Sequence, residues 1–171
     1  LDLLWPGLRG ALDGNVAVDG TWAEPHARGR FAARDVTFAG VSAVRLEVSG
    51  EVGLAAATPL ALTIDAAGVR RGLVAAEQVQ AVLSGTTGAN RVTLDVVAEE
   101  WRGAAVAQGG LDGAIWRGTL EHFEFDEMLL GRWQLEEPAP AVLGVGRAGL
   151  GTSCMLHASG ARWCAQLDVE G

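Results

Sequence analysis

The sequence predicts an all-β protein built around an antiparallel sheet. Apolar and polar residues alternate along several stretches, which is the period of a strand with one buried face. Turn-forming residues separate these stretches at strand-length intervals. Glycine supplies 24 of the 171 residues, about twice its average usage, without the triplet repeat of collagen. Many turns between strands are therefore expected.

Four stretches show the alternation most clearly, namely residues 44–48, 60–64, 91–98 and 121–126. Alternate side chains of a strand point to opposite faces, so each stretch has one apolar and one polar face. The apolar faces together form the candidate lining of a shared apolar surface. Its members are Val44, Leu46, Val48, Leu60, Leu62, Ile64, Val92, Leu94, Val96, Phe123 and Phe125.

Three other regions are less regular. Residues 73–83 contain a helical spacing of apolar residues, but the turn-rich residues 84–90 that follow also suit a hairpin, which is the preferred interpretation. Residues 103–113 are rich in Ala and Gly and give little strand signal, so their pairing register stays open. The Pro-rich residues 137–141 are too short for a linker. Residues 1–171 are therefore expected to form a single β-rich segment.

The charge of the chain disfavours two kinds of partner. The formal net charge is −8, and no basic run is longer than Arg70-Arg71. Neutralising nucleic acid phosphates or anionic lipid headgroups requires clustered basic residues, so neither nucleic acid nor an anionic headgroup surface is expected as a partner. No stretch approaches the roughly 20 apolar residues of a membrane-spanning helix. The chain starts at Leu1 without an initiator Met, and we expect it to belong to a longer protein whose anchor would lie upstream.

The two cysteines, Cys154 and Cys164, flank a predicted turn at Ser159-Gly160. A three-residue loop there would place them opposite each other on neighbouring strands, where a disulfide is geometrically feasible. The alternative is a pair of unrelated thiols. A bridge would indicate an oxidising compartment, and closing so short a loop would contribute roughly 2–3 kcal/mol.

Motifs that carry chemistry are weak in this sequence. Residues 144–149 match the glycine pattern of dinucleotide-binding loops, but turn and strand residues follow where a helix is required. The pair His122 and Glu124 lacks a third metal ligand, and no serine lies in a nucleophile elbow. An acidic cluster, relieved in sequence only by Arg132, is interpreted as a solvated outer face; it contains Glu121, Glu124, Asp126, Glu127, Glu136 and Glu137. We expect no catalytic residue, no metal and no cofactor.

A series of short motifs resembles the TamB family, the AsmA-like inner-membrane component of the translocation and assembly module. The first group begins at Leu8-Arg9-Gly10-Ala11-Leu12-Asp13-Gly14 and continues with Val16, Val18, Gly20-Thr21, Pro25 and Gly29. The second group is Trp116-Arg117-Gly118-Thr119-Leu120 and Trp133-Gln134-Leu135-Glu136-Glu137-Pro138-Ala139. Cys154 and Cys164 stand where the cysteine hairpin of the family would follow. The motifs are individually weak, and their order carries the resemblance.

The resemblance implies an elongated, curved β-sheet, or β-taco, with an apolar concave face, in the periplasm of a Gram-negative cell. Strands with one apolar face must bury it, and the sequence predicts no helix to cover them, so a curled sheet also satisfies the packing requirement. Trp5, Trp22, Trp101 and Trp163 could serve as core anchors, groove-edge residues or hairpin caps.

Three functional hypotheses follow. The leading one is a non-enzymatic conduit whose groove carries phospholipid acyl chains between the inner and outer membranes for outer-membrane biogenesis. The second is an assembly scaffold that works with the outer-membrane barrel protein TamA and offers sheet edges to client proteins. The third is a structural β-solenoid whose interior is filled by its own side chains.

Overall fold

The computed structural model describes residues 9–21, 25–53 and 57–170. It contains one antiparallel sheet of 12 strands. The strands are β1 (Arg9–Gly20), β2 (Pro25–Phe38), β3 (Val41–Gly53), β4 (Pro59–Arg71), β5 (Val74–Thr86), β6 (Asn90–Val97), β7 (Trp101–Asp112), β8 (Ile115–Glu127), β9 (Gly131–Leu135), β10 (Ala139–Gly144), β11 (Arg147–His157) and β12 (Arg162–Glu170). The all-β prediction is confirmed.

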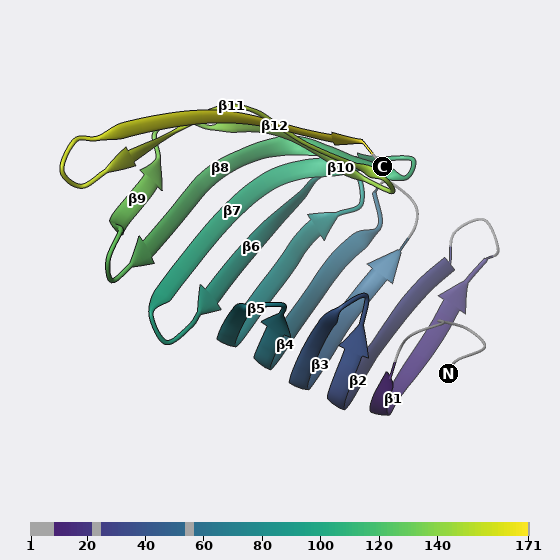
Figure 1. Ribbon diagram of the computed structural model, residues 1–171. Coiled ribbons are helices and arrows are strands. Elements are labelled where there is room, and N and C mark those ends of the chain that lie inside the picture. Colours follow the sequence, from purple (N-terminus) through teal and green to yellow (C-terminus); the bar gives the residue numbers. More distant parts are fainter. Residues whose placement is uncertain (1–8, 22–24, 54–56, 171) are drawn as a thin grey trace.

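The sheet is a meander in which strands adjacent in sequence are neighbours in space. Strand order runs from β1 to β8 without interruption and then continues through β10, β11 and β12. Figure 1 shows long strands that curve along their length, with β11 and β12 running across the top of the view. The sheet is therefore strongly curved.

Strands β9 and β10 share one place in the sheet, because both pair with β8 and with β11. Residues 136–138 separate them, and Pro138 lacks the N–H that an uninterrupted ladder would need at this position. The Glu136 N–H still donates to the Cys154 carbonyl oxygen, at 2.8 Å, and so holds the interruption against β11.

A bend crosses the first strands of the sheet. Asp35 in β2 and Gly68 in β4 have positive φ angles of 50° and 62°. Val44 of β3 lies between them and is paired with neither strand. Local departures from strand geometry of this kind change the direction of a sheet, which is how bulges produce corners.

The sheet has no second layer packed against it within the described residues. The accessible surface is 11462 Å², whereas a compact monomer of 17.7 kDa would expose roughly 8,000 Å². The buried apolar residues are few and mostly small: Ala33, Leu60, Ala76 and Ala139. Most apolar side chains are thus left partly accessible.

The described part also contains no helix with the length and hydropathy to cross a membrane.

The two unclear regions of the sequence are both strands. Residues 73–83 fall largely in β5, which forms a hairpin with β6, so the hairpin interpretation is confirmed over the helical one. Residues 103–113 fall largely in β7, which pairs along its length with β6 and β8. The predicted residues Trp5, Trp22 and Leu8 lie outside the described residues.

Candidate functional site

One face of the sheet carries rows of apolar side chains. Cross-strand partners in an antiparallel ladder point to the same side, so the register defines which residues share a face. One row, from β2 to β8, is Phe31, Val48, Ile64, Ala81, Leu94, Ala105 and Phe123. A parallel row, ending in β10, is Gly29, Gly50, Leu62, Leu83, Val92, Ala107, Leu120 and Ala139. Neither row contains an ionisable side chain, and we call this side the apolar face.

The opposite side, the polar face, carries the residues that alternate with those rows. The row next to Phe31 is Ala32, Glu47, Asp65, Gln80, Asp95, Ala104, Glu124 and Gln134. Several of these side chains bind each other across strands; for example, the Gln80 amide donates to the Asp65 carboxylate at 2.7 Å. The polar and apolar residues of this sheet are thus sorted by side.

Ion pairs on the polar face favour the charged form of two of its carboxylates, Glu47 and Glu124. Glu47 accepts hydrogen bonds from Arg45 at 2.6 Å and from Arg30 at 3.1 Å. The bond from Arg45, followed by that from Arg30, lowers the pKa of Glu47. The bond from Arg132, at 2.6 Å, likewise lowers the pKa of Glu124 and raises that of Arg132. These exposed pairs favour a wetted surface and contribute little to stability individually.

The acidic cluster is neutralised by more than one arginine, which corrects the expectation that Arg132 alone relieves it. Arg91 of β6 lies 2.9 Å from Glu121, and Arg162 of β12 lies 2.6 Å from Glu136. Both arginines are distant in sequence from their partners and are brought to them by the sheet. Glu127 instead accepts backbone N–H bonds from Leu129 and Leu130 in the β8–β9 turn.

A hollow of about 470 Å³ lies on the apolar face and is lined almost entirely by apolar atoms. Its lining includes Leu60 of β4 and Leu167 of β12. These strands are far apart in the order of the sheet, so its curvature is what brings them to one site. Leu83, Val92, Leu120 and Leu150 also line this first hollow.

A second hollow, of about 390 Å³, is aromatic in character. Its lining is Phe123, Phe125, Trp133, Met155 and Trp163, from β8, β9, β11 and β12. The Trp133 indole N–H donates to the Leu130 carbonyl oxygen at 3.0 Å, so the polar atom of this ring is satisfied. His157 is the cross-strand partner of Trp133, and the centroids of the two rings lie 4.9 Å apart.

The sequence-predicted lining residues are distributed over this face. Leu60 and Val92 line the first hollow, and Phe123 and Phe125 line the second. Leu46, Val48, Leu62, Ile64, Leu94 and Val96 lie in register on the apolar face outside both hollows. Val44 lies at the bend, unpaired and 62% exposed, and is not brought together with the others. A role for any of these residues in binding stays a prediction.

Some residues of the hollows have no counterpart among the predicted lining. Trp116 and Asn90 line the first hollow, and Trp133 and Met155 line the second. The spacing of Trp116 and Gly118 was the available signal, because residues two apart on a strand share a face. What the sequence does not show is which distant strand the indole meets.

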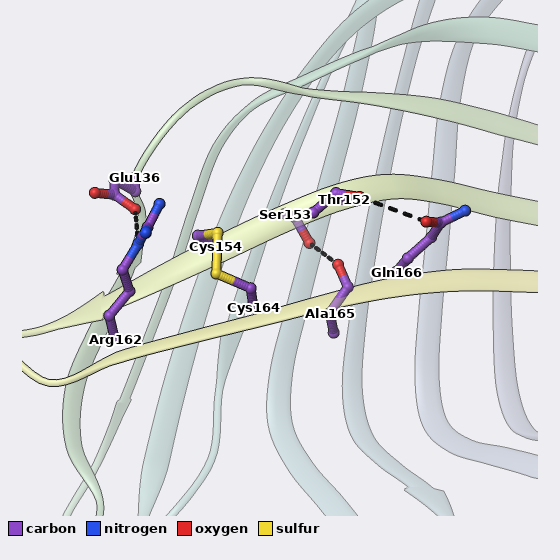
Figure 2. Close-up of a disulfide and its surroundings, with 8 residues drawn as sticks. All are labelled: Glu136, Thr152, Ser153, Cys154, Arg162, Cys164, Ala165 and Gln166. Carbon is purple, nitrogen blue, oxygen red and sulfur yellow. Dashed lines mark hydrogen bonds and ion pairs between the residues drawn. A yellow bond between two sulfur atoms is a disulfide. The ribbon is translucent and has the colours of Figure 1, made fainter.

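Cys154 and Cys164 are joined by a disulfide across β11 and β12 (Figure 2). They are direct cross-strand partners, and the loop between the strands closes with a hydrogen bond from the His157 N–H to the Ala161 carbonyl oxygen. The next pair along the strands, Met155 and Trp163, lines the second hollow. The disulfide therefore lies on the polar face, directly behind that hollow.

Removing this bridge is expected to loosen the C-terminal hairpin. Replacing both Cys154 and Cys164 by serine should lower its stability by roughly 2–3 kcal/mol, because the unfolded chain regains the entropy of an open loop. Amide hydrogen exchange of β11 and β12 measures the change, and reduced wild-type protein serves as the matched control. Unchanged protection of these amides in both samples would contradict the prediction.

The glycine-rich residues 144–149 form a hairpin connection. Gly144 ends β10, Arg147 begins β11, and Gly146 takes a positive φ of 70° in the turn between them. A strand therefore occupies the place where dinucleotide binding would need a helix N-terminus.

Comparison with known proteins gives one family. The model for the TamB N-terminal domain matches residues 1–170. No curated protein and no solved structure matches the chain. Members of this family are transport and assembly components of the periplasmic envelope and pair with TamA in outer-membrane biogenesis. Since the match spans almost every residue of a chain that also has the curved β-sheet which the motifs implied, the chain belongs to the TamB family.

Proposed function

We propose that this chain is a non-enzymatic part of a periplasmic bridge, and that its apolar face carries phospholipid acyl chains between the inner and outer membranes. The observation that supports this most is the sorting of the sheet by side. Rows without ionisable side chains run across seven or more strands on one face, while carboxylates and arginines pair on the other.

The energetics of acyl chains suit such a surface. Each methylene removed from water contributes about 0.8 kcal/mol, and no specific polar contact is required. Leu83, Val92 and Leu120 in the first hollow offer aliphatic contacts from β5, β6 and β8. Headgroups would remain in solvent, because the apolar rows provide no charged group to bind them. A continuous apolar row also lets a chain move from strand to strand without crossing a polar barrier.

A photocrosslinking amino acid placed on either face tests the proposal. Leu94 and Asp95 are adjacent in β6 and belong to the apolar and polar rows respectively, so they form a matched pair of positions. Leu62 of β4, on the apolar face, and Glu47 of β3, on the polar face, provide a second pair of positions. We expect phospholipid adducts from Leu62 and Leu94 in cells and few from Glu47 and Asp95. Equal yields from both faces would defeat the proposal.

An assembly scaffold acting with TamA is the second candidate. Within the described residues, β1 pairs only with β2, and β12 pairs only with β11, so each outer strand has one unpaired edge. Such edges accept an additional strand by backbone hydrogen bonding. Recovery of polypeptide instead of phospholipid in the same crosslinking experiment would favour this candidate.

A further inference from the structure

Trp116 occupies an unusual place on the apolar face. The residue pairs with Leu111 of β7 and Leu143 of β10, and its ring lines the first hollow. Gly109 and Gly118 are cross-strand partners in β7 and β8. A Cβ atom on Gly109 would lie 2.6 Å from the indole Cζ2, and one on Gly118 would also overlap the ring. The indole thus lies directly on the backbone of two strands, in the space that the glycines leave.

The indole is held in this place by a buried amide. Its Nε1–H donates to Asn90 Oδ1 at 2.8 Å, and Asn90 is only 6% exposed. The Asn90 Nδ2 donates in turn to the carbonyl oxygens of Thr86 and Thr87, at 3.2 and 3.3 Å. A buried polar side chain on an otherwise apolar surface is tolerated because its bonds are made, and those bonds fix its orientation.

The turn that anchors Asn90 is itself tied to two other strands. The Thr87 hydroxyl donates to the Gly53 carbonyl oxygen at 2.6 Å, at the end of β3. The Leu111 N–H donates to the Thr87 carbonyl oxygen at 2.9 Å, at the end of β7. The β5–β6 turn therefore connects one end of the apolar face across several strands. A ring tethered to this turn has little freedom to move aside.

We infer that the Trp116 ring sets the depth of the first hollow and thereby limits how much of an acyl chain the hollow buries. The inference rests on the proposed function and adds a residue that determines which chains fit. Removing the ring would expose bare backbone over Gly109 and Gly118 and extend the hollow toward the β5–β6 turn. Additional methylenes of a bound chain would then leave water.

Binding of fatty acids of increasing length tests the inference. Saturated fatty acids from dodecanoate to icosanoate are used to displace cis-parinaric acid from the 171-residue chain. For the wild-type protein we expect affinity to rise about fourfold per methylene, the equivalent of ~0.8 kcal/mol, and then to level off. For Trp116→Ala the rise should continue to longer chains before it levels. A general loss of structure would weaken all chain lengths alike, so the position of the plateau is the diagnostic readout.

Trp101→Ala is the matched control, because it also removes an indole. This ring lies outside the first hollow, tilted against Phe125 with the ring centroids 5.9 Å apart. The plateau of this variant should stay at the wild-type length. Trp116→Phe keeps a ring but loses the hydrogen bond to Asn90. This variant provides the test if Trp116→Ala does not fold. Its affinity should also level off at longer chains than that of the wild-type protein. A variant profile that coincides with wild type would overturn the role of Trp116 alone. A wild-type protein that binds no fatty acid would overturn both this role and the proposed function.

Discussion

Replacing Leu83 by aspartate is expected to weaken the binding of acyl chains about 100-fold. Leu83 lines the first hollow and pairs with Leu62 and Val92 on the apolar face. A carboxylate at this place would lose water when an acyl chain covers it, and its apolar neighbours offer no compensating hydrogen bond. A cost of about 3 kcal/mol corresponds to that loss of affinity. Displacement of cis-parinaric acid by hexadecanoate measures the effect.

Ser84→Asp is the matched control for this prediction. Ser84 is the next residue of β5 and pairs with Ala61 and Arg91 on the polar face. The same new charge there stays in water and lies across from an arginine, so binding should change by less than about twofold, in line with the small effects of exposed charges. Similar affinities for Leu83→Asp and Ser84→Asp would show that acyl chains do not contact the apolar face.

Gly50→Ala is expected to be the most destabilising of the small substitutions in the sheet, by about 3 kcal/mol. Gly50 has a φ of 150°, a conformation that is essentially restricted to glycine. A Cβ atom there would also overlap the Ala61 carbonyl oxygen of β4 and approach the Leu62 Cα within 2.8 Å. Backbone atoms cannot rotate away, so β3 and β4 would have to separate. Urea unfolding followed by far-ultraviolet circular dichroism measures the loss.

Gly103→Ala separates this effect from the general consequences of losing a glycine. Gly103 also lies in a central strand, paired with Val96 and Phe125. A Cβ atom there would meet only ordinary contacts, the nearest at 3.6 Å to the Glu124 carbonyl oxygen. Its stability should stay the same or rise slightly, because alanine restricts the unfolded chain. Equal losses of stability in the Gly50→Ala and Gly103→Ala variants would indicate that the close approach of β3 and β4 is not the cause of the destabilisation.

Much of the fold could be predicted because alternation is a local property. Residues 60–64 and 91–98 each alternate locally, and they lie in β4 and, except for Ala98, in β6 as expected. The strand β7 was harder to predict, since its Ala and Gly residues have little preference of their own and their conformation is set by pairing with β6 and β8. The bend was not foreseen because no local pattern marks Asp35 as a residue with positive φ, and the ladders of β2 with β1 and β3 skip this residue.

The candidate site was predictable only in part, for a related reason. Alternation identifies an apolar side of each strand, and Leu60, Val92 and Phe123 were found in this way. The hollows depend additionally on register and curvature, which bring β4 and β12 to one place. The bond between Trp116 and Asn90 joins residues 26 apart in sequence, and no local pattern indicates it.

The meander also makes the length of the sheet, measured across its strands, independent of its width, measured along them. From β1 to β8 every strand pairs with its immediate predecessor and successor in the chain. Insertion of one more hairpin would thus extend the sheet by two interstrand spacings, about 10 Å, while the strand length would still set the width of the apolar face. Duplication or loss of hairpins can therefore change the length of such a sheet without changing the length or curvature of its strands.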